Sequence, residues 1–364
     1  MSQTVRVAAV QAAKRSIPYT VGDPGEALTH VNRNLDALNT LADRAADEGC
    51  HIVAFPEDTL GTLEWESGNW AHAADLLGPA EALMLQRLGA VAADHGTSVI
   101  CCNDCPGPGG IYNTAILLGP NGNEIGRYRK VQLPIHEQAR QRGDGFPVFE
   151  APGVGPIGMC ICYDMVFPET TRALALAGAD IVFHLTMGGA SMAGPDASLA
   201  AFRTRAADSF VYLVVAFRGG GSLIIGPKGD ILADGGSEPD AIVMADIDPG
   251  AGREAGDAIG GMTEDFRARL FAERVPSAYG ILTEECPPIR DRVRHIHVPS
   301  GEESSSLGAE ALTTGADAFY EAERWAAEGK SEAAIARYRA LAERFGTLWI
   351  GRAAADRLAD LTGR

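Results

Sequence analysis

The most constraining feature of the sequence is an order of apolar runs and helical patterns that occurs twice. In the first half this order begins with VRVAAVQA and closes with NTAILLGPNGNEIGRYRK, which turns at Pro120-Asn121-Gly122. The second half reads IGMCIC, ETTRALALAG, DIVFHL, DASLAAFRTRAADS and FVYLVVAF, and SLIIGPKGDILADG then turns at Pro227-Lys228-Gly229. Strands that are apolar throughout need cover on both faces. The order therefore predicts two α/β halves, each a β-α-β-α-β unit closed by a hairpin.

The C-terminal part follows a different pattern. Residues 286–311 are rich in proline, serine and charge, and they predict a linker between a domain at 1–285 and an extension at 312–364. In the extension, two apolar stripes flank Gly329 and predict two helices and a third, which resembles a tetratricopeptide-type hairpin. One such unit cannot bury its apolar face alone. We expect it to pack on the main domain, on a second copy of the chain or on a partner protein.

Composition limits the partners and the compartment. The formal charge of −17 repels phosphate backbones and anionic lipids, so neither nucleic acid nor membrane is an expected partner. No apolar run approaches the length of about 18 residues that spans a membrane, and no signal-peptide pattern opens the chain, so we expect a cytoplasmic protein. Cys102 and Cys105 have the spacing of half a zinc site, but no second pair follows, so we expect no metal.

Cys162 ends an apolar strand in GMCICYDMVFPET. Pro168 and Glu169 suit the first turn of a helix, which places the thiol at a strand-to-helix turn where nearby helix N-termini favour its thiolate. Cys160 lies two residues earlier, which puts it on the same face of the strand, and we interpret it as a core residue. The alternative is that Cys162, like Cys160, is an ordinary buried cysteine of the core.

Two further segments favour a catalytic role for Cys162 over a role in core packing. Glu57, in VAFPEDTL, follows a strand that Pro56 ends, and Lys130, in RYRKVQLP, ends a hairpin strand. Each alone is equally typical of a solvated surface. Together with Cys162 they supply what acyl transfer to a thiol needs. A carboxylate takes the thiol proton, the thiolate attacks a carbonyl or nitrile carbon, and a fixed cation stabilises the charge that develops.

The ordered motifs FPE, YRKVQLP and GMCICYDMVFPE resemble those of the carbon–nitrogen hydrolase (nitrilase) superfamily, over residues 4–285. The resemblance implies an α/β fold, a four-layer α-β-β-α sandwich, to which this chain adds its C-terminal helices. It also implies a Glu-Lys-Cys triad without a cofactor, in which Glu57 is the base, Lys130 the oxyanion cation and Cys162 the nucleophile. The backbone N–H of Tyr163 would be the second oxyanion donor.

Other candidate residues surround these motifs. The superfamily carries a second glutamate after its lysine motif, which implies that Glu137 orients the lysine and the leaving nitrogen; a solvated loop carboxylate is the alternative. His136 beside it is a candidate substrate contact. In HLTMGGASMAGPD, Gly188 indicates close backbone approach or an adaptable loop, and His184 either lines the pocket or is a core histidine. Arg203 is a candidate partner for a substrate carboxylate, with a structural ion pair as the alternative.

The branch of the superfamily indicates the substrate. CYD after the strand is similar to the amidase and carbamoylase branches, so the resemblance implies a linear amide or N-carbamoyl substrate, a covalent acyl-enzyme, and release of ammonia or an amine. Nitrile hydrolysis on the same triad is an alternative. A non-catalytic dimeric scaffold that recruits a partner through the C-terminal helices is the rival from another class. The resemblance also implies a homodimer or a larger homo-oligomer.

Overall fold

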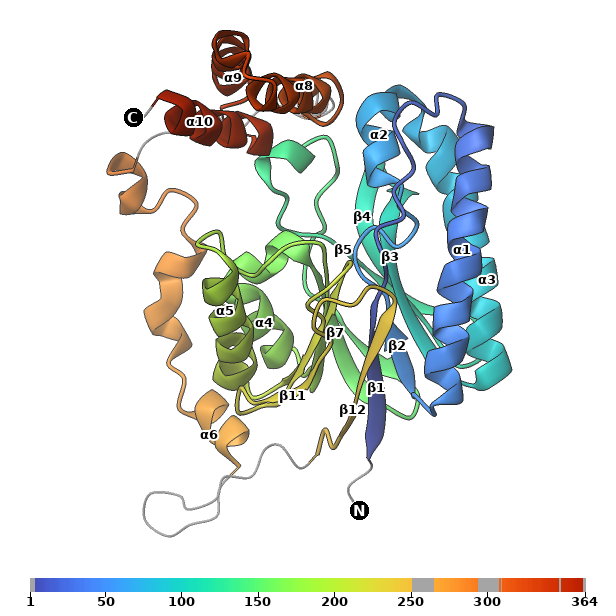
Figure 1. Ribbon diagram of the computed structural model, residues 1–364. Helices are drawn as coiled ribbons and strands as arrows, with labels where there is room; N and C mark the ends of the chain where they lie inside the picture. The colour runs from blue at the N-terminus through green and yellow to red at the C-terminus, as the bar shows by residue number, and fades with distance from the viewer. Residues whose placement is uncertain (1–3, 251–264, 294–307, 309, 347, 363–364) are drawn as a thin grey trace.

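Two sheets packed face to face, with helices on both outer sides, form the body of the molecule (Figure 1). The computed structural model describes residues 4–250, 265–293, 308, 310–346 and 348–362. Each sheet has six strands, in the orders β12-β1-β2-β3-β4-β5 and β11-β10-β9-β8-β7-β6. The prediction of a four-layer α-β-β-α sandwich is confirmed.

The first sheet is covered on its outer face by α1 (Pro24–Asp47) and α3 (Ala73–His95). The Asp23 side chain caps α1 by accepting a hydrogen bond from the Glu26 backbone N–H, and Gly96, with φ +65°, ends α3. The strands of this sheet are β1 (Val5–Gln11), β2 (Ile52–Ala54), β3 (Ser98–Gly107), β4 (Gly110–Leu118), β5 (Glu124–Arg129) and β12 (Ala241–Ile247).

The second sheet is covered by α4 (Pro168–Leu176) and α5 (Pro195–Ser209). Its central strands β7, β8 and β9 run parallel, so their carboxyl ends meet at one edge. Parallel sheets of this type carry ligand sites at that edge. The strands are β6 (Val148–Ala151), β7 (Gly155–Ile161), β8 (Ile181–Thr186), β9 (Tyr212–Phe217), β10 (Leu223–Ile225) and β11 (Ile231–Asp234).

Alternation along the strands divides the core into layers. On β8, Phe183 and Leu185 point between the two sheets, whereas Val182 packs under α4 and α5. On β2, Ile52 and Ala54 likewise join the layer between the sheets. Because both faces of each sheet are covered, the strands read as continuous apolar runs, which is the pattern that predicted the fold.

Several elements, two strands and a short helix among them, were not predicted. The strands β6 and β12 are additional, and α2 (Leu63–Asn69) lies between β2 and α3. The chain returns from the second sheet through β12, which pairs antiparallel with β1 and sets Val5 opposite Ile247. In β12, an edge strand, only Val243 and Ile247 are buried, although its first five residues are apolar.

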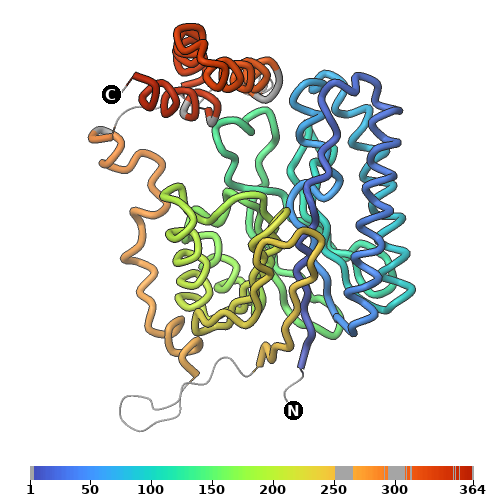
Figure 2. The backbone as a smooth tube through the Cα atoms, viewed as in Figure 1, coloured from blue at the N-terminus to red at the C-terminus, as the bar shows by residue number. Residues whose placement is uncertain are grey.

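The predicted C-terminal helices are present as α8 (Ala316–Ala327), α9 (Ser331–Phe345) and α10 (Trp349–Thr362). They lie over one end of the sandwich and bury an apolar cluster of their own (Figure 2). The Tyr19 hydroxyl donates a 2.6 Å hydrogen bond to Asp317, and Ala311–Gly315 contacts α2. The extension therefore packs on the main domain, one of the three expected surfaces.

The segment that precedes the extension contains α6 (Phe266–Ala272) and short 3-10 turns. Residues 294–307 of the predicted linker lie outside the described residues, and the domain boundaries stay a prediction. Within the described ranges, no helix combines the length and the hydropathy that a membrane crossing needs.

Candidate active site

Three chain segments bring Glu57, Lys130 and Glu137 into direct contact. Glu57 follows β2, Lys130 follows β5, and Glu137 lies on the 3-10 turn Ile135–Glu137. Lys130 Nζ donates to Glu57 Oε1 at 3.0 Å and to Glu137 Oε2 at 2.8 Å. Lys130 is fully buried and Glu57 is 1% exposed, so this is a desolvated ion cluster and not a surface one.

Cys162 lies at the turn that follows β7. Its φ of +43° is unusual for a residue with a side chain, and it ends the strand alternation there. The Cys162 side chain packs against the layer between the sheets, while Cys160 lies in the outer layer under α4 and α5. The expectation that both sulfurs share one face was wrong, because the positive φ turns the second sulfur away.

The Cys162 thiol is neutral at rest. Burial and then the charge of Glu57 raise its pKa, the charge of Lys130 lowers it only in part, and the net result is a pKa of about 12. These effects also place the sulfur within electrostatic reach of both groups. The expected helix-favoured thiolate is therefore not what the structure shows, and the sulfur needs a base to become a nucleophile.

Glu57 has one carboxylate oxygen engaged and one free. Oε1 accepts hydrogen bonds from Lys130 and, at 2.8 Å, from Asn113 Nδ2. Oε2 is buried and has no hydrogen-bond partner among the described residues. A buried acceptor without a partner is costly in a core, so this oxygen is suited to take a proton from a neighbouring group. Asn113 was not predicted; its only sequence signal is a polar residue at the start of an apolar run.

Lys130 is held as an ammonium. Burial lowers its pKa, but the carboxylates of Glu137 and Glu57 outweigh burial, and the pKa lies well above its ordinary value. For Glu137, burial raises the pKa, but the charge of Lys130 outweighs it and the pKa is lowered. Both groups are therefore charged at neutral pH, and Lys130 is the fixed positive charge of the cluster that acts on the sulfur.

Asp164 ties the cysteine segment to the lysine segment. Its carboxylate accepts hydrogen bonds from the Ile161 backbone N–H at 2.9 Å and the Gln132 backbone N–H at 2.8 Å. It also accepts one from the Tyr128 hydroxyl at 2.6 Å. None of these contacts was predicted; those with Tyr128 and Gln132 join segments more than 30 residues apart in the sequence.

Arg140 fixes the loop that carries Glu137. Its guanidinium pairs with Glu66 at 3.0 Å and with Asp104, and all three side chains are nearly or fully buried. The Arg140 backbone N–H donates to the Glu137 carbonyl at 3.0 Å. These ion pairs were not predicted either, because each of the three residues alone is typical of a protein surface.

Among the other candidate residues, Gly188, Tyr163 and His136 lie close to the cluster. A Cβ added at Gly188 would lie 3.7 Å from Cys162 Sγ, in ordinary contact. Tyr163 follows Cys162 directly. The His136 side chain is 57% exposed and lies 3.9 Å from Glu137, at the rim of the ion cluster.

The remaining two candidates lie elsewhere. His184 is fully buried in the outer layer beside Cys160 and Phe202, and burial lowers its pKa to about 3. It is a neutral core residue on the other face of the sheet, not a pocket residue. Arg203 Nε donates to the Gly229 carbonyl at 2.7 Å and holds the second hairpin turn, so it is not placed for a substrate carboxylate.

In the described part of the chain, no three or more His, Cys, Asp or Glu side chains are grouped so that they could hold a metal ion. Cys102 and Cys105 are buried in β3, where the Cys102 sulfur lies 3.4 Å from the Asn113 side-chain oxygen.

Comparison with known proteins agrees with this geometry. The family model described as carbon-nitrogen hydrolase matches residues 6–257. A protein named nitrilase from Pyrococcus abyssi is 32% identical over 233 residues, which are 60% of this chain and 84% of the relative. A deaminated glutathione amidase from Synechocystis is 29% identical over 244 residues, 60% of this chain and 88% of the relative.

Solved structures show the same similarity. An amidase from Nesterenkonia is 27% identical with a TM-score of 0.55, over 68% of this chain and 92% of that chain. A mutant of that amidase, also 27% identical with a TM-score of 0.55, covers 67% of this chain and 93% of its own. It shows the result of Michael addition of acrylamide at the active site cysteine.

Proposed function

This chain belongs to the carbon-nitrogen hydrolase family, and we propose that it hydrolyses a linear amide or N-carbamoyl substrate through a covalent acyl-enzyme on Cys162. One observation carries the proposal. Glu57 Oε2 has no partner among the described residues, Glu57 Oε1 accepts from the Lys130 ammonium, and the charges of both residues act on the half-buried Cys162 thiol. A base, a cation and a nucleophile with these properties suit acyl transfer to sulfur.

In the first half of the reaction, Glu57 Oε2 takes the Cys162 proton as the sulfur attacks the substrate carbonyl carbon. The carbonyl oxygen becomes an anion, which the Lys130 ammonium and the backbone N–H of Tyr163 stabilise. The proton on Glu57 then passes to the substrate nitrogen, the C–N bond breaks, and ammonia or an amine leaves. A thioester remains on the sulfur.

In the second half, Glu57 takes a proton from water, and the hydroxide attacks the thioester carbon. The C–S bond breaks, the sulfur regains the proton, and the carboxylic or carbamic acid leaves. Glu137 orients Lys130 and accepts a hydrogen bond from the leaving nitrogen. His136, half-exposed beside Glu137, is placed to meet the part of the substrate that faces solvent.

Nitrile hydrolysis is a second candidate, because the relative from Pyrococcus abyssi carries the name nitrilase and the same three groups suit a nitrile carbon. Amidases among the relatives and solved structures favour the amide. The scaffold hypothesis is weaker, because a scaffold does not need an ammonium buried between two carboxylates, which costs solvation energy.

The experiment is ammonia and amine release over a panel of amides, ureides and nitriles. We expect turnover of at least one amide or ureide, loss of that turnover in Cys162→Ala, and wild-type turnover in the matched control Cys286→Ala. Cys286 is exposed, whereas Glu57 and Lys130 are buried. Undiminished turnover in Cys162→Ala would reject the proposed nucleophile, and turnover of nitriles alone would select the second candidate.

A further inference from the structure

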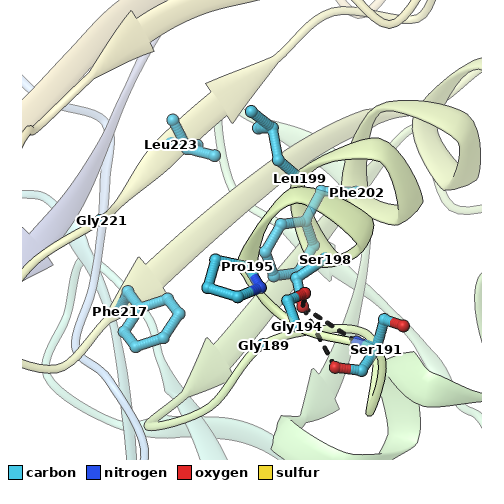
Figure 3. Close-up of a pocket in the computed structure, with 10 residues that line it drawn as sticks. All are labelled: Gly189, Ser191, Gly194, Pro195, Ser198, Leu199, Phe202, Phe217, Gly221 and Leu223. Atoms are coloured by element: carbon cyan, nitrogen blue, oxygen red, sulfur yellow. Dashed lines mark hydrogen bonds between the residues drawn. The ribbon is translucent and has the colours of Figure 1, made fainter.

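A cavity and an ion cluster lie near the strand ends of the described chain. Figure 3 shows the cavity, which has a volume of about 380 Å³, lies at the start of α5 and is lined by uncharged residues. Phe202 of its wall packs in the outer layer, on the face of the second sheet opposite to the one on which Cys162 packs. The ion cluster around Arg140, in contrast, contacts the loop that carries Glu137 and therefore bears on the candidate site.

One guanidinium in this cluster bonds to two carboxyl groups. Arg140 Nη2 donates to Glu66 Oε2 at 3.0 Å, and Arg140 Nε donates to Asp104 Oδ2. Glu66 lies on α2 and Asp104 on β3, so the cluster joins two elements of the main domain to the Glu137 loop. The Glu66 and Asp104 side chains are buried. If both were ionised, two buried negative charges would share one positive charge.

Each carboxyl group also has one oxygen that the guanidinium does not reach. Glu66 Oε1 and Asp104 Oδ1 are buried and have no hydrogen-bond partner among the described residues. The two carboxyl groups lie within hydrogen-bonding distance of each other. Two ionised carboxylates at that distance repel, and neither can donate. A single proton would replace this repulsion by an O–H···O⁻ hydrogen bond and would give both oxygens a partner.

The surroundings of Glu66 favour it as the group that holds the proton. Burial and then the charge of Asp104 raise the pKa of Glu66 well above 4.5, and the charge of Arg140 lowers it only in part. The Thr62 hydroxyl also faces the Glu66 carboxyl. Burial lowers the pKa of Arg140, but the charges of Asp104 and Glu66 outweigh burial and raise it, so the guanidinium stays charged.

The other titratable groups near the cluster supply no further cation. The groups on which the charges of Asp104 and Arg140 act are Asp58, Cys102, Cys105, Glu137 and His136. Burial raises the pKa of both thiols and lowers the pKa of the histidine, so these three groups are neutral at neutral pH. The two acids have cations of their own, Arg218 and Lys130. Among these described groups, only a proton is left to balance the second carboxyl of the cluster.

The cluster holds the loop that carries Glu137. The Arg140 backbone N–H donates to the Glu137 carbonyl at 3.0 Å, and the Arg140 guanidinium carbon lies 5.1 Å from the centre of the Trp70 ring. Glu137 in turn accepts from Lys130 Nζ at 2.8 Å. A displaced guanidinium would therefore change where Glu137 meets Lys130.

We propose that Glu66 is a carboxylic acid whose Oε1 donates a hydrogen bond to Asp104 Oδ1. Held by this pair, Arg140 positions the loop that carries Glu137. The inference rests on the proposed function, because the position of Glu137 matters to hydrolysis only if Lys130 stabilises the oxyanion. Glu66 keeps its proton at low pH and loses it as the pH rises through its raised pKa. Two carboxylates then face each other and repel, and kcat/KM falls at alkaline pH.

Infrared spectroscopy tests the proton without any substrate. The spectrum of the wild type minus that of Glu66→Gln, from about pH 6 to about pH 9, should contain the C=O band of a protonated carboxylic acid, which weakens as the pH rises. The same subtraction with Glu64→Gln should contain no such band. Glu64 is the matched control because it lies on the same helix at a half-buried position outside the cluster. A difference spectrum with carboxylate bands alone for Glu66 over this whole range would overturn the proposal.

The pH profile of kcat/KM tests the positioning role, with the amide or ureide that the wild type hydrolyses fastest in the release panel. Glu66→Gln keeps an N–H donor for Asp104 and an oxygen for Arg140 but cannot ionise. At the alkaline pH where the wild-type kcat/KM has fallen to half of its plateau, Glu66→Gln should still be at its own plateau. Glu66→Leu removes the donor and should lower kcat/KM by about tenfold or more. Glu64→Gln should follow the wild type.

The outcomes separate the two proposals. If the wild type hydrolyses nothing in the panel, the proposed function fails and the positioning role fails with it, while the infrared band still decides the shared proton. If a substrate is hydrolysed and Glu66→Gln loses kcat/KM at the same alkaline pH as the wild type, only the role of Glu66 fails. Equal kcat/KM values for Glu66→Gln and Glu66→Leu would also reject that role.

Discussion

The Tyr128 hydroxyl donates a 2.6 Å hydrogen bond to Asp164, and this contact joins the two sheets beside the candidate site. Tyr128 lies two residues before Lys130, and Asp164 lies two residues after Cys162. Both side chains are fully buried. The separation of the proposed nucleophile and oxyanion cation is therefore set by a buried contact that itself touches no substrate.

Asp164→Asn tests this contact through its pH dependence. Burial raises the pKa of Asp164 to about 6 from 3.8, so the folded chain holds this proton more tightly than the unfolded chain does. The stability from the protonated form is complete below about pH 4 and is lost as the pH rises through about 6. The free-energy advantage of the wild type over Asp164→Asn should therefore narrow from about pH 4 to about pH 7.

Urea denaturation at several pH values measures that difference. Asn cannot accept from all three donors, so we also expect a cost of about 1–3 kcal/mol from backbone N–H groups left without a partner. Tyr128→Phe is the comparison, because it removes one donor and keeps the titrating carboxyl. If the difference in unfolding free energy between wild type and Asp164→Asn widened with rising pH, the raised pKa of Asp164 would be contradicted.

Glu57→Gln should separate the acidity of the thiol from catalysis. The charge of Glu57 raises the pKa of Cys162, so its removal should lower that pKa and speed alkylation of Cys162 by iodoacetamide at a given pH. Hydrolysis should nevertheless fall by about 10²–10⁴-fold, because the general base is lost.

Peptide mass spectrometry measures the alkylation, with the exposed Cys286 as the internal reference. Glu150→Gln, which neutralises an exposed carboxylate on β6, is the control and should change neither rate. Slower alkylation together with retained hydrolysis in Glu57→Gln would remove the residue from the proposed mechanism.

Lys130→Ala should cost both activity and stability. Removing the ammonium should lower hydrolysis by about 10²–10³-fold, as the loss of an oxyanion donor does. It also leaves Glu57 and Glu137 buried without their cation, which costs about 3–5 kcal/mol. Cys162→Ala should lose activity without a comparable loss of stability, since it uncovers no charge.

The stability difference at Lys130 should depend on pH. The pKa of Glu137 is lowered from 4.5, so its attraction to Lys130 stabilises the fold fully above about that pH. This stabilisation is lost as the pH falls through the lowered pKa. The unfolding free energies of the wild type and of Lys130→Ala should therefore converge in acid. A difference between them that stays constant from about pH 3 to about pH 7 would argue against the ion pair.

The homo-oligomer predicted from the family resemblance is tested by sedimentation equilibrium. We expect a mass that is a multiple of the 38.3 kDa chain at micromolar concentration. A single 38.3 kDa species across the concentration range would refute this prediction.

The pattern of apolar runs in the sequence predicted most of the fold. The residues that follow the strands included the three main candidates for the site. Glu57 and Cys162 lie just past apolar strands and Lys130 follows a hairpin strand, so the rule that α/β sheets build sites at strand ends made all three candidates. Glu57 and Lys130 are in direct contact and the charges of both act on Cys162, while the catalytic roles of all three residues stay proposals.

What the sequence did not predict depends on contacts between distant segments. Asp164 and Asn113 act through partners in other segments, and the positive φ of Cys162 is set by the turn in which it sits. His184 shows the converse: a polar residue near a strand end suggests a site, but strand alternation places it under α5. Periodicity gives the face of a residue only when the register of the strand is known.

The pairing of β1 with β12 has a consequence for synthesis of the chain. Val5 emerges early from the ribosome, but its neighbour Ile247 emerges only after both halves have been translated. Until then one edge of the N-terminal sheet has no partner and exposes unsatisfied backbone groups, a state in which nascent chains associate wrongly. The N-terminal sheet is therefore completed only after most of the sandwich has been translated.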